Sequence, residues 1–141
     1  MKIRIAALFL VGAAAIAAMG CSMSPAHVDH AGPAAEDLKI DDLLTSTLAL
    51  APDAEVIVSR VLIPPHTTLP KHWHPGEEFV YVLQGSAVLW QKDKQDITLA
   101  KGDLLRIPLK QIHTATAGQD GATALVFRVH EKGKPARTLT E

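Results

Sequence analysis

The sequence has little of several features that define large classes of proteins. Cys21 is its only cysteine, which excludes an intrachain disulfide. Lys and Arg number 14 against 15 Asp and Glu, giving a formal charge of −1 at pH 7, and there is no basic patch or aromatic motif of RNA-binding type. Nucleic-acid binding is therefore not expected. With 141 residues, 48% of them apolar and 21% charged, the chain has the size and composition of one globular domain.

Common catalytic signatures are missing as well. The sequence has no G-x-S-x-G nucleophile elbow, no P-loop, and no Rossmann fingerprint in a βαβ setting. Cys21 is also its only thiol. If the protein is an enzyme, its chemistry has to come from other side chains.

The N-terminus has the pattern of a targeting segment. Lys2 and Arg4 give a positive n-region, and residues 5–18 form an apolar h-region of signal-peptide length. That run falls short of the ~20 residues that span a bilayer, which disfavours an uncleaved anchor. We expect residues 1–20 to be a signal peptide that exports the chain to the periplasmic side of a bacterial membrane.

Cys21 follows this segment and is a candidate lipidation site. The small residues before it resemble a bacterial lipobox, although Ala18 stands where Leu is usual. The alternative is an ordinary signal peptide with a leftover thiol. Residues 21–37 are small and polar, which predicts a flexible tether. Loss of Lys2 and Arg4 makes the mature chain more acidic, so we expect contact with the membrane only through a lipid anchor.

Residues 38–141 have the pattern of an all-β domain. No stretch shows a convincing helical period, and short strand candidates alternate with turn signals, among them Gly85 and residues 118–121. About nine strands at this spacing predict a sandwich or barrel of antiparallel strands. The candidate strands are residues 45–50, 55–63, 71–74, 78–83, 87–91, 96–99, 103–107, 112–116 and 122–130.

Two of these strands, residues 78–83 and 87–91, are apolar on both faces. An antiparallel strand with one face in water would alternate polar and apolar residues. Either the strand at residues 45–50 or a second subunit therefore covers the outer face. This is a weak indication of a homodimer.

Two histidines and a glutamate fall close together in the sequence. His72 and His74 are two positions apart on an extended stretch, so their imidazoles leave the same face of the sheet. The turn after them can fold Glu78 back beside the two rings, whereas Trp73 and Glu77 point away. Two neutral imidazoles and a carboxylate suit one divalent transition metal, with Fe, Mn, Zn, Ni and Cu not distinguished.

A fourth ligand has to come from elsewhere in the chain, and His113 is the obvious candidate. It follows Gly102, Pro108 and a short turn, on a candidate strand whose neighbours Ile112 and Thr114 take the other face. Four protein ligands leave one or two positions on a six-coordinate metal for substrate, water or dioxygen.

These spacings resemble the two motifs of the cupin family. The pattern H-x-H-x3-E-x6-G runs from His72 to Gly85, and G-x5-P-x4-H runs from Gly102 to His113. The resemblance spans roughly residues 55–130. It implies a cupin jelly-roll β-barrel of antiparallel strands, commonly dimeric, with one metal held inside by three His and one Glu. Carried over to this sequence, the metal ligands are His72, His74, Glu78 and His113.

The sequence departs from the cupin pattern at three positions, none of which is a ligand position. His66 and Lys110 stand where the family has glycine, and Ala117 stands where it has asparagine. Lys110 puts in doubt a tight turn with φ > 0 just before His113, because lysine enters that region less readily than glycine.

Several other polar residues are candidates for the pocket. Arg60, Arg106 and Arg128 each lie in a candidate strand, and one that pointed inward could bind a carboxylate bidentately. The alternative for each is a salt bridge at the rim or on a sheet face. His66 is expected in a loop, with a pocket contact as the alternative, and His130 is expected to be solvated.

The resemblance to cupins leads to three hypotheses about function. Cupin relatives include dioxygenases, oxidases, decarboxylases, lyases and isomerases, so the first is a metal-dependent enzyme acting on a small oxygenated molecule, with Glu78 as a candidate proton acceptor. The second is a non-catalytic periplasmic module that binds a small ligand or the metal. The third is a metal-free scaffold protein. The sequence does not choose between the first two.

Overall fold

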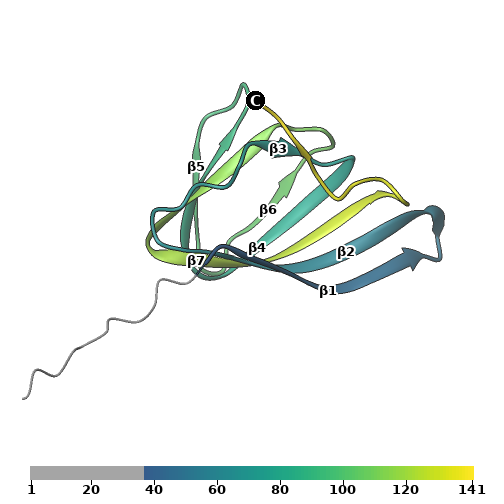
Figure 1. Cartoon of the computed structure of the whole chain (residues 1–141), viewed down its shortest axis with the longest axis horizontal. Helices are drawn as coiled ribbons and strands as arrows, with labels where there is room; N and C mark the ends of the chain where they lie inside the picture. Colours follow the sequence, from purple (N-terminus) through teal and green to yellow (C-terminus); the bar gives the residue numbers. More distant parts are fainter. Residues whose placement is uncertain (1–36) are drawn as a thin grey trace, which may run out of the picture. The chain divides into compact units, whose positions relative to one another are not determined.

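The computed structural model describes residues 37–141, and these form a curled sheet of antiparallel strands (Figure 1). The prediction of an all-β fold is confirmed. The predicted signal peptide, Cys21 and nearly all of the predicted tether lie outside the described residues. The strands are β1 (Lys39–Leu48), β2 (Ala51–Ile63), β3 (His72–Trp73), β4 (Gly76–Gln91), β5 (Ile97–Ala100), β6 (Leu104–Ile107), β7 (His113–Glu131) and β8 (Thr138–Leu139).

Within residues 37–141 there is no helix with the length and apolar character needed to cross a membrane.

The two longest strands, β4 and β7, pair along their whole length and form the spine of the fold. Their register runs from Gly76 opposite His130 to Gln91 opposite His113. We call this pair the β4–β7 ribbon. Along the chain direction of each strand, the outer neighbour changes half-way. β7 pairs first with β3 and then with β2, and β4 pairs first with β6 and then with β5. The ribbon therefore belongs to two layers, β1-β2-β7-β4-β6 and β8-β3-β7-β4-β5.

The ribbon bends between the layers at two glycines. Gly85 and Gly121 have φ values of 71° and 72°, and a Cβ on Gly85 would lie 2.1 Å from the carbonyl oxygen of Gly121. The β4 register shifts on both sides of Gly85. The sequence predicted turns at Gly85 and at residues 118–121 that separate four strands, and this was wrong. The glycines form bulges that redirect a continuous strand instead of ending it.

The core lies between the layers, near the bend. Inward-facing aliphatic residues alternate along β2, β4 and β7, as the two-residue period of a strand requires. They form two buried clusters, one of Val61, Ile63, Ala87, Ala117, Ala122 and Val126 and the other of Val82, Leu89, Leu99 and Ile107.

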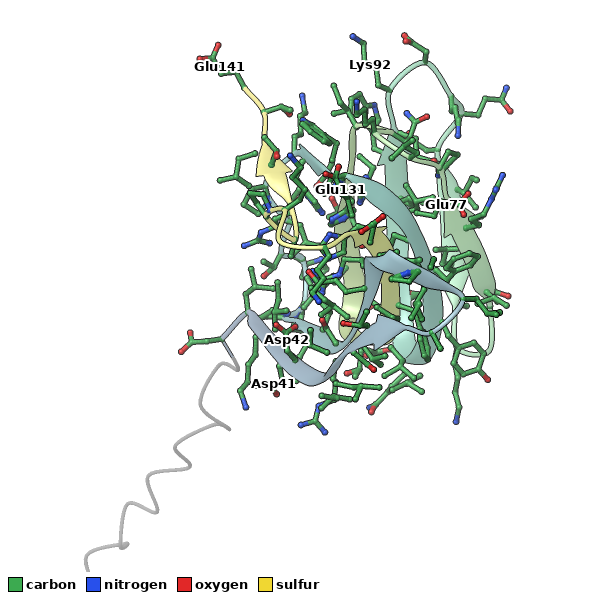
Figure 2. The ribbon with its side chains drawn as sticks, turned by 90° about the vertical axis from the view of Figure 1, so that its right-hand side faces the viewer. Asp41, Asp42, Glu77, Lys92, Glu131 and Glu141 are labelled. Atoms are coloured by element: carbon green, nitrogen blue, oxygen red, sulfur yellow. The ribbon has the colours of Figure 1, made fainter. Side chains whose placement is uncertain are left out.

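β1 starts earlier than the sequence predicted and occupies an edge. It pairs with β2 from Lys39 opposite Leu62 onwards, and it carries Asp41 and Asp42 (Figure 2). It extends the sheet sideways and does not cover the outer face of β4. In a single chain, therefore, the outward residues of the β4–β7 ribbon include large exposed side chains, such as Tyr81 at 40% and Phe127 at 38%.

Candidate metal centre

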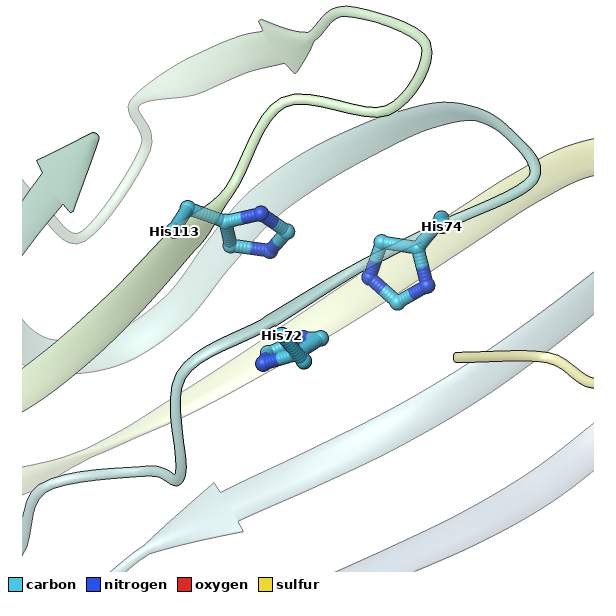
Figure 3. A group of neighbouring side chains, drawn as sticks. All are labelled: His72, His74 and His113. Carbon is cyan, nitrogen blue, oxygen red and sulfur yellow. The ribbon is translucent and has the colours of Figure 1, made fainter. Parts of the chain in front are cut away.

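Three histidines from two strands and a turn come together inside the barrel. The pairing of β3 with β7 places His72 opposite His113, and His74 follows β3 directly. Their ring centroids are 4.3–5.2 Å apart, and one ligand nitrogen from each lies within 4.8 Å of the others (Figure 3). All three side chains are buried. The arrangement could hold a metal ion.

Glu78 lies against this cluster from β4. Its Oε2 is 2.7 Å from Nε2 of His74, and its Oε1 is 3.7 Å from Nε2 of His113. The next residue towards the strand start, Glu77, points outward and forms an ion pair of 2.7 Å with Arg106. The structure thus brings together the four residues that the sequence singled out as ligands.

The three imidazoles are oriented by backbone carbonyl groups. Nδ1 of His72 lies 2.8 Å from the Pro70 oxygen, Nδ1 of His74 lies 2.6 Å from the Ala136 oxygen, and Nδ1 of His113 lies 2.8 Å from the Gln111 oxygen. A carbonyl oxygen only accepts, so each Nδ1 donates its hydrogen.

In a neutral imidazole, Nε2 is then left with a free lone pair. Nε2 of His74 and of His113 are buried and make no hydrogen bond within the described part of the chain. Although Nε2 of His74 is close to Glu78, the two atoms do not have hydrogen-bond geometry. Unpaired lone pairs beside a carboxylate fit a divalent metal, and the carbonyl contacts are the orienting interactions usual for metal-bound histidine.

The protonation states of two of these residues agree with that role. Burial lowers the pKa of His72 from 6.5 to about 4, although the hydrogen bond to Pro70 opposes the shift. Burial raises the pKa of Glu78, but hydrogen bonds and charge from His113 and His74 in their protonated form outweigh it and hold the pKa well below its ordinary value. At neutral pH, therefore, His72 is neutral and Glu78 is ionised, the forms that bind metals.

Arg128 is the one of the three candidate arginines that points inward. It is 6% exposed, its Nη2 donates a hydrogen bond to Ser59 Oγ, and its Nε lies 3.8 Å from Oε2 of Glu78. Arg60 and Arg106 are exposed and pair with acidic residues on the outside of the sheet.

His130 is buried, and the prediction that it is solvated was wrong. It is 3% exposed and its Nε2 lies 3.7 Å from Oε1 of Glu55. β7 continues to Glu131 with β2 on one side and β4 on the other, so the inward row that contains Arg128 continues to His130.

The two positions where cupin glycines are replaced keep the glycine-like backbone. His66 and Lys110 have φ values of 57° and 59°. The turn that the lysine put in doubt does form, and the N–H of Lys110 donates to the carbonyl oxygen of His74 at 3.1 Å. His66 is exposed and does not line the cavity at the histidines.

The C-terminal segment is part of the centre, and no local sequence pattern predicts this. β8 pairs with β3, Ala136 orients His74, and Arg137 lines the cavity. β8 is only two residues long and the contact from Ala136 spans 62 positions, so neither periodicity nor local spacing marks it.

A cavity of about 90 Å³ adjoins the histidines and has two unlike ends. The polar end is formed by His72, His74, Glu78, His113, Arg128 and Arg137. The aliphatic end, towards the bend, is formed by branched side chains and alanines, among them Val80, Val82, Leu89, Leu99, Ile107 and Val126. Since successive inward positions on β4 and β7 lead from one end to the other, the same strands build both.

Comparison with protein families identifies the central region of the chain. Residues 59–129 match the sequence model described as Cupin domain. No curated protein sequence matches the chain.

Solved structures share the fold at low sequence identity. A DMSP lyase from Ruegeria pomeroyi is 23% identical with a TM-score of 0.59, and the match covers 73% of this chain and 51% of that one. An uncharacterized conserved protein with a double-stranded β-helix domain, from Klebsiella pneumoniae, is 22% identical with a TM-score of 0.57 over 78% of this chain and 90% of that one. An oxalate decarboxylase is 21% identical with a TM-score of 0.58 over 68% and 27%.

The chain thus spans about half the length of the lyase and about a quarter of the decarboxylase. At these identities the likeness shows the fold alone.

Proposed function

Because this chain belongs to the cupin family, on the match of residues 59–129, we propose that it is a metal-dependent enzyme acting on a small oxygenated molecule. The observation that carries the proposal is the orientation of the three imidazoles. Each Nδ1 donates to a backbone carbonyl group, so each Nε2 presents a lone pair, with the Glu78 carboxylate beside them.

The ligands in this proposal are His72, His74, Glu78 and His113. A divalent metal bound there would polarise an oxygen atom of the substrate as a Lewis acid. Three histidines and a glutamate accommodate Fe, Mn, Zn, Ni or Cu, so the proposal does not select among them.

The surrounding residues of the chain have their own roles. The aliphatic end of the cavity keeps bulk water from the reacting group, which strengthens charge interactions at the polar end. Among residues 37–141, Glu78 is the only one with a carboxylate that lines the cavity, and its Oε2 faces Arg128. We assign Glu78 as the proton acceptor.

A non-catalytic binding module is the second candidate. It is favoured by the small share of the lyase and decarboxylase chains that this chain covers, since whatever the rest of those chains contributes has no counterpart in the match. In that case the same cavity captures a small ligand or the metal without turnover.

The test is metal analysis followed by activity assays on the purified protein. We expect about one divalent metal per chain in the wild type, little in His72→Ala and His113→Ala, and an unchanged content in His66→Ala, whose ring is exposed in a loop. If the wild type holds no more metal than the first two variants, even after reconstitution, the assignment of the metal site is wrong. Oxygen uptake and product formation are then measured with phenols, keto acids and oxalate. Turnover by the wild type that is lost in those variants supports the enzyme, and binding without turnover supports the module.

We also propose that the protein is exported and lipid-anchored through Cys21, on the strength of the N-terminal sequence pattern. The protein should then fractionate with bacterial membranes and incorporate labelled palmitate. Cys21→Ser should abolish the label and release the protein into the soluble fraction. A membrane fraction unchanged by the substitution would contradict the anchor.

A homodimer through the outer face of the β4–β7 ribbon is the remaining part of the proposal. Tyr81, Leu83, Val88 and Phe127 are large apolar residues with 38–40% exposure, and β1 leaves them uncovered. Light scattering should give twice the chain mass, and Phe127→Lys should give a monomer. A wild-type monomer at micromolar concentration would rule the dimer out.

A further inference from the structure

Arg128 carries hydrogen-bond donors that the protein does not use. Its guanidinium has five N–H groups, yet among the described residues only Nη2 has a hydrogen-bond partner, Ser59. Nε is buried and donates to nothing there, because Oε2 of Glu78, at 3.8 Å, is too far for a hydrogen bond. A buried guanidinium with unused donors is costly unless a ligand completes it. The side chain lines the cavity, so the missing acceptor belongs there.

The charges at the polar end favour an anion. Arg128 and Arg137 both line the cavity, and Glu78 is the only acidic residue of the described part of the chain that does. Asp42 lies 3.9 Å from Arg128, but its side chain is more than half exposed and it does not line the cavity. A bound divalent cation would add two further positive charges. A carboxylate is the group that a guanidinium binds with two parallel hydrogen bonds.

The rest of the cavity offers a ligand no polar partner. Apart from the residues of the polar end, every lining residue is Val, Ile, Leu or Ala. A second charged or hydroxyl group on the ligand would lose its hydration there without compensation. No Phe, Tyr or Trp ring among the described residues lines the cavity, so a flat ligand has no such ring to stack on at the aliphatic end. This surface suits a compact alkyl group.

The volume limits the size of that ligand. One water molecule needs roughly 10–15 Å³ on this measure of cavity volume. About 90 Å³ therefore accommodates a molecule of roughly six to nine non-hydrogen atoms.

From these four observations we propose that the site binds a small aliphatic monocarboxylate. The carboxylate lies at the polar end, on Arg128, and the alkyl group fills the aliphatic end. The proposal rests on the proposed function, since it specifies the substrate class of the same centre. It makes Arg128 the residue that selects for negative charge and Val80, with its aliphatic neighbours, the surface that rejects a second polar group.

Three probes with six non-hydrogen atoms each separate the two parts of the proposal. Isobutyrate has the charge and the alkyl group, isobutyramide has the alkyl group without the charge, and oxalate has a second carboxylate in its place. Binding is measured by titration calorimetry on the full protein. Isobutyrate and isobutyramide are titrated into both the zinc-loaded and the metal-free protein. Oxalate is titrated only into the metal-free protein, because it would chelate zinc. We expect isobutyrate to bind at least tenfold more tightly than either of the others.

Matched variants assign the effect to residues. Arg128→Gln should weaken isobutyrate binding at least tenfold and leave isobutyramide binding unchanged, whereas Arg106→Gln, at an exposed position on β6, should change neither. Val80→Thr keeps the side-chain shape and adds a hydroxyl inside the cavity, and it should weaken isobutyrate several-fold. Ile97→Thr is the control, because Ile97 is 37% exposed and does not line the cavity.

The outcomes that overturn the proposal are specific. Equal affinity for isobutyrate and isobutyramide would show that the site does not select for negative charge. Oxalate binding as tightly as isobutyrate would show that the site does not select for an alkyl group. If Arg128→Gln does not fold, the comparison of the three probes on the wild type decides alone. A wild type that takes up no metal defeats the proposed function, while the metal-free titrations still test the carboxylate site, so the two failures are distinguishable.

Discussion

The two ends of the barrel interior are built by the same strands and have opposite chemistry. At the aliphatic end, Val82 and Leu89 contact only other apolar groups. At the polar end, each buried histidine is held by a carbonyl group and Arg128 is held by Ser59. Burying polar groups costs free energy unless they are paired, and those of the polar end are paired on one side only. The aliphatic end therefore stabilises the fold, whereas the polar end has the unused donors and lone pairs that the proposed binding requires.

The largest effect is expected when a residue of the polar end is made apolar. In His113→Leu, we expect metal affinity to fall by more than the roughly 10–100-fold that loss of an orienting partner costs, because a ligand itself is removed. The metal-free protein should still fold, with a loss of only about 1–3 kcal/mol, because the carbonyl oxygen of Gln111 loses its donor. Metal titration and thermal unfolding of the metal-free protein check both halves. A large destabilisation without loss of metal would show that His113 is structural.

The converse substitution weakens the aliphatic end. Leu89 is 3% exposed in the core, so Leu89→Ala should reduce the free energy of unfolding by about 2–5 kcal/mol. Metal content per folded chain should stay at the wild-type value. Denaturant unfolding and metal analysis on the same samples make the measurement. Loss of metal with an intact fold would mean that the two ends are not separable.

Acid should affect the polar end first. The folded pKa of His72 is about 4 against an ordinary 6.5, so between these values the unfolded chain binds more protons than the folded one. The free energy of unfolding of the metal-free protein should therefore fall as the pH is lowered from 6.5 to 4. His72→Gln should flatten the decline between pH 6.5 and 5, above the range where carboxylates titrate. His66→Gln, in an exposed loop, should leave it intact, and equal curves for wild type and His72→Gln would exclude His72 as the source.

The smallest effect concerns the turn that leads into the polar end. Lys110 adopts φ 59°, which costs a non-glycine residue roughly 1–2 kcal/mol, while glycine loses about 0.5–1 kcal/mol in chain entropy on folding. Lys110→Gly should thus stabilise the protein by about 1 kcal/mol or less, seen as a raised unfolding midpoint. Lys101→Gly, in a turn without positive φ, should not stabilise it. A lowered midpoint in Lys110→Gly would show that the lysine makes a compensating contact.

Local sequence patterns were sufficient for the all-β class and for part of the centre. The two-residue spacing of His72 and His74 predicts a shared face, and the structure brings Glu78 and His113 beside them. Their role as ligands stays a prediction. Gly85 was misjudged because a glycine within an apolar run marks either a turn or a bulge, and only the pairing with β7 decides between them.

Residues whose position depends on distant pairing could not be predicted. The burial of His130 follows from β2 and β4 flanking the end of β7, and neither the length of β7 nor its neighbours is visible in the local sequence. For the same reason, the local sequence did not show which of Arg60, Arg106 and Arg128 points into the cavity. The part played by Ala136 and Arg137 depends on a two-residue strand.

The carbonyl contact from Ala136 to His74 has a consequence for the order of events in the cell. A chain leaving the ribosome exposes His72 and His74 long before His113, and Ala136 comes last. The centre is therefore assembled only after residue 136 has been synthesised, because no shorter length of chain contains all the parts. If the protein is exported unfolded and binds a metal as proposed, the ion is taken from the supply in the destination compartment.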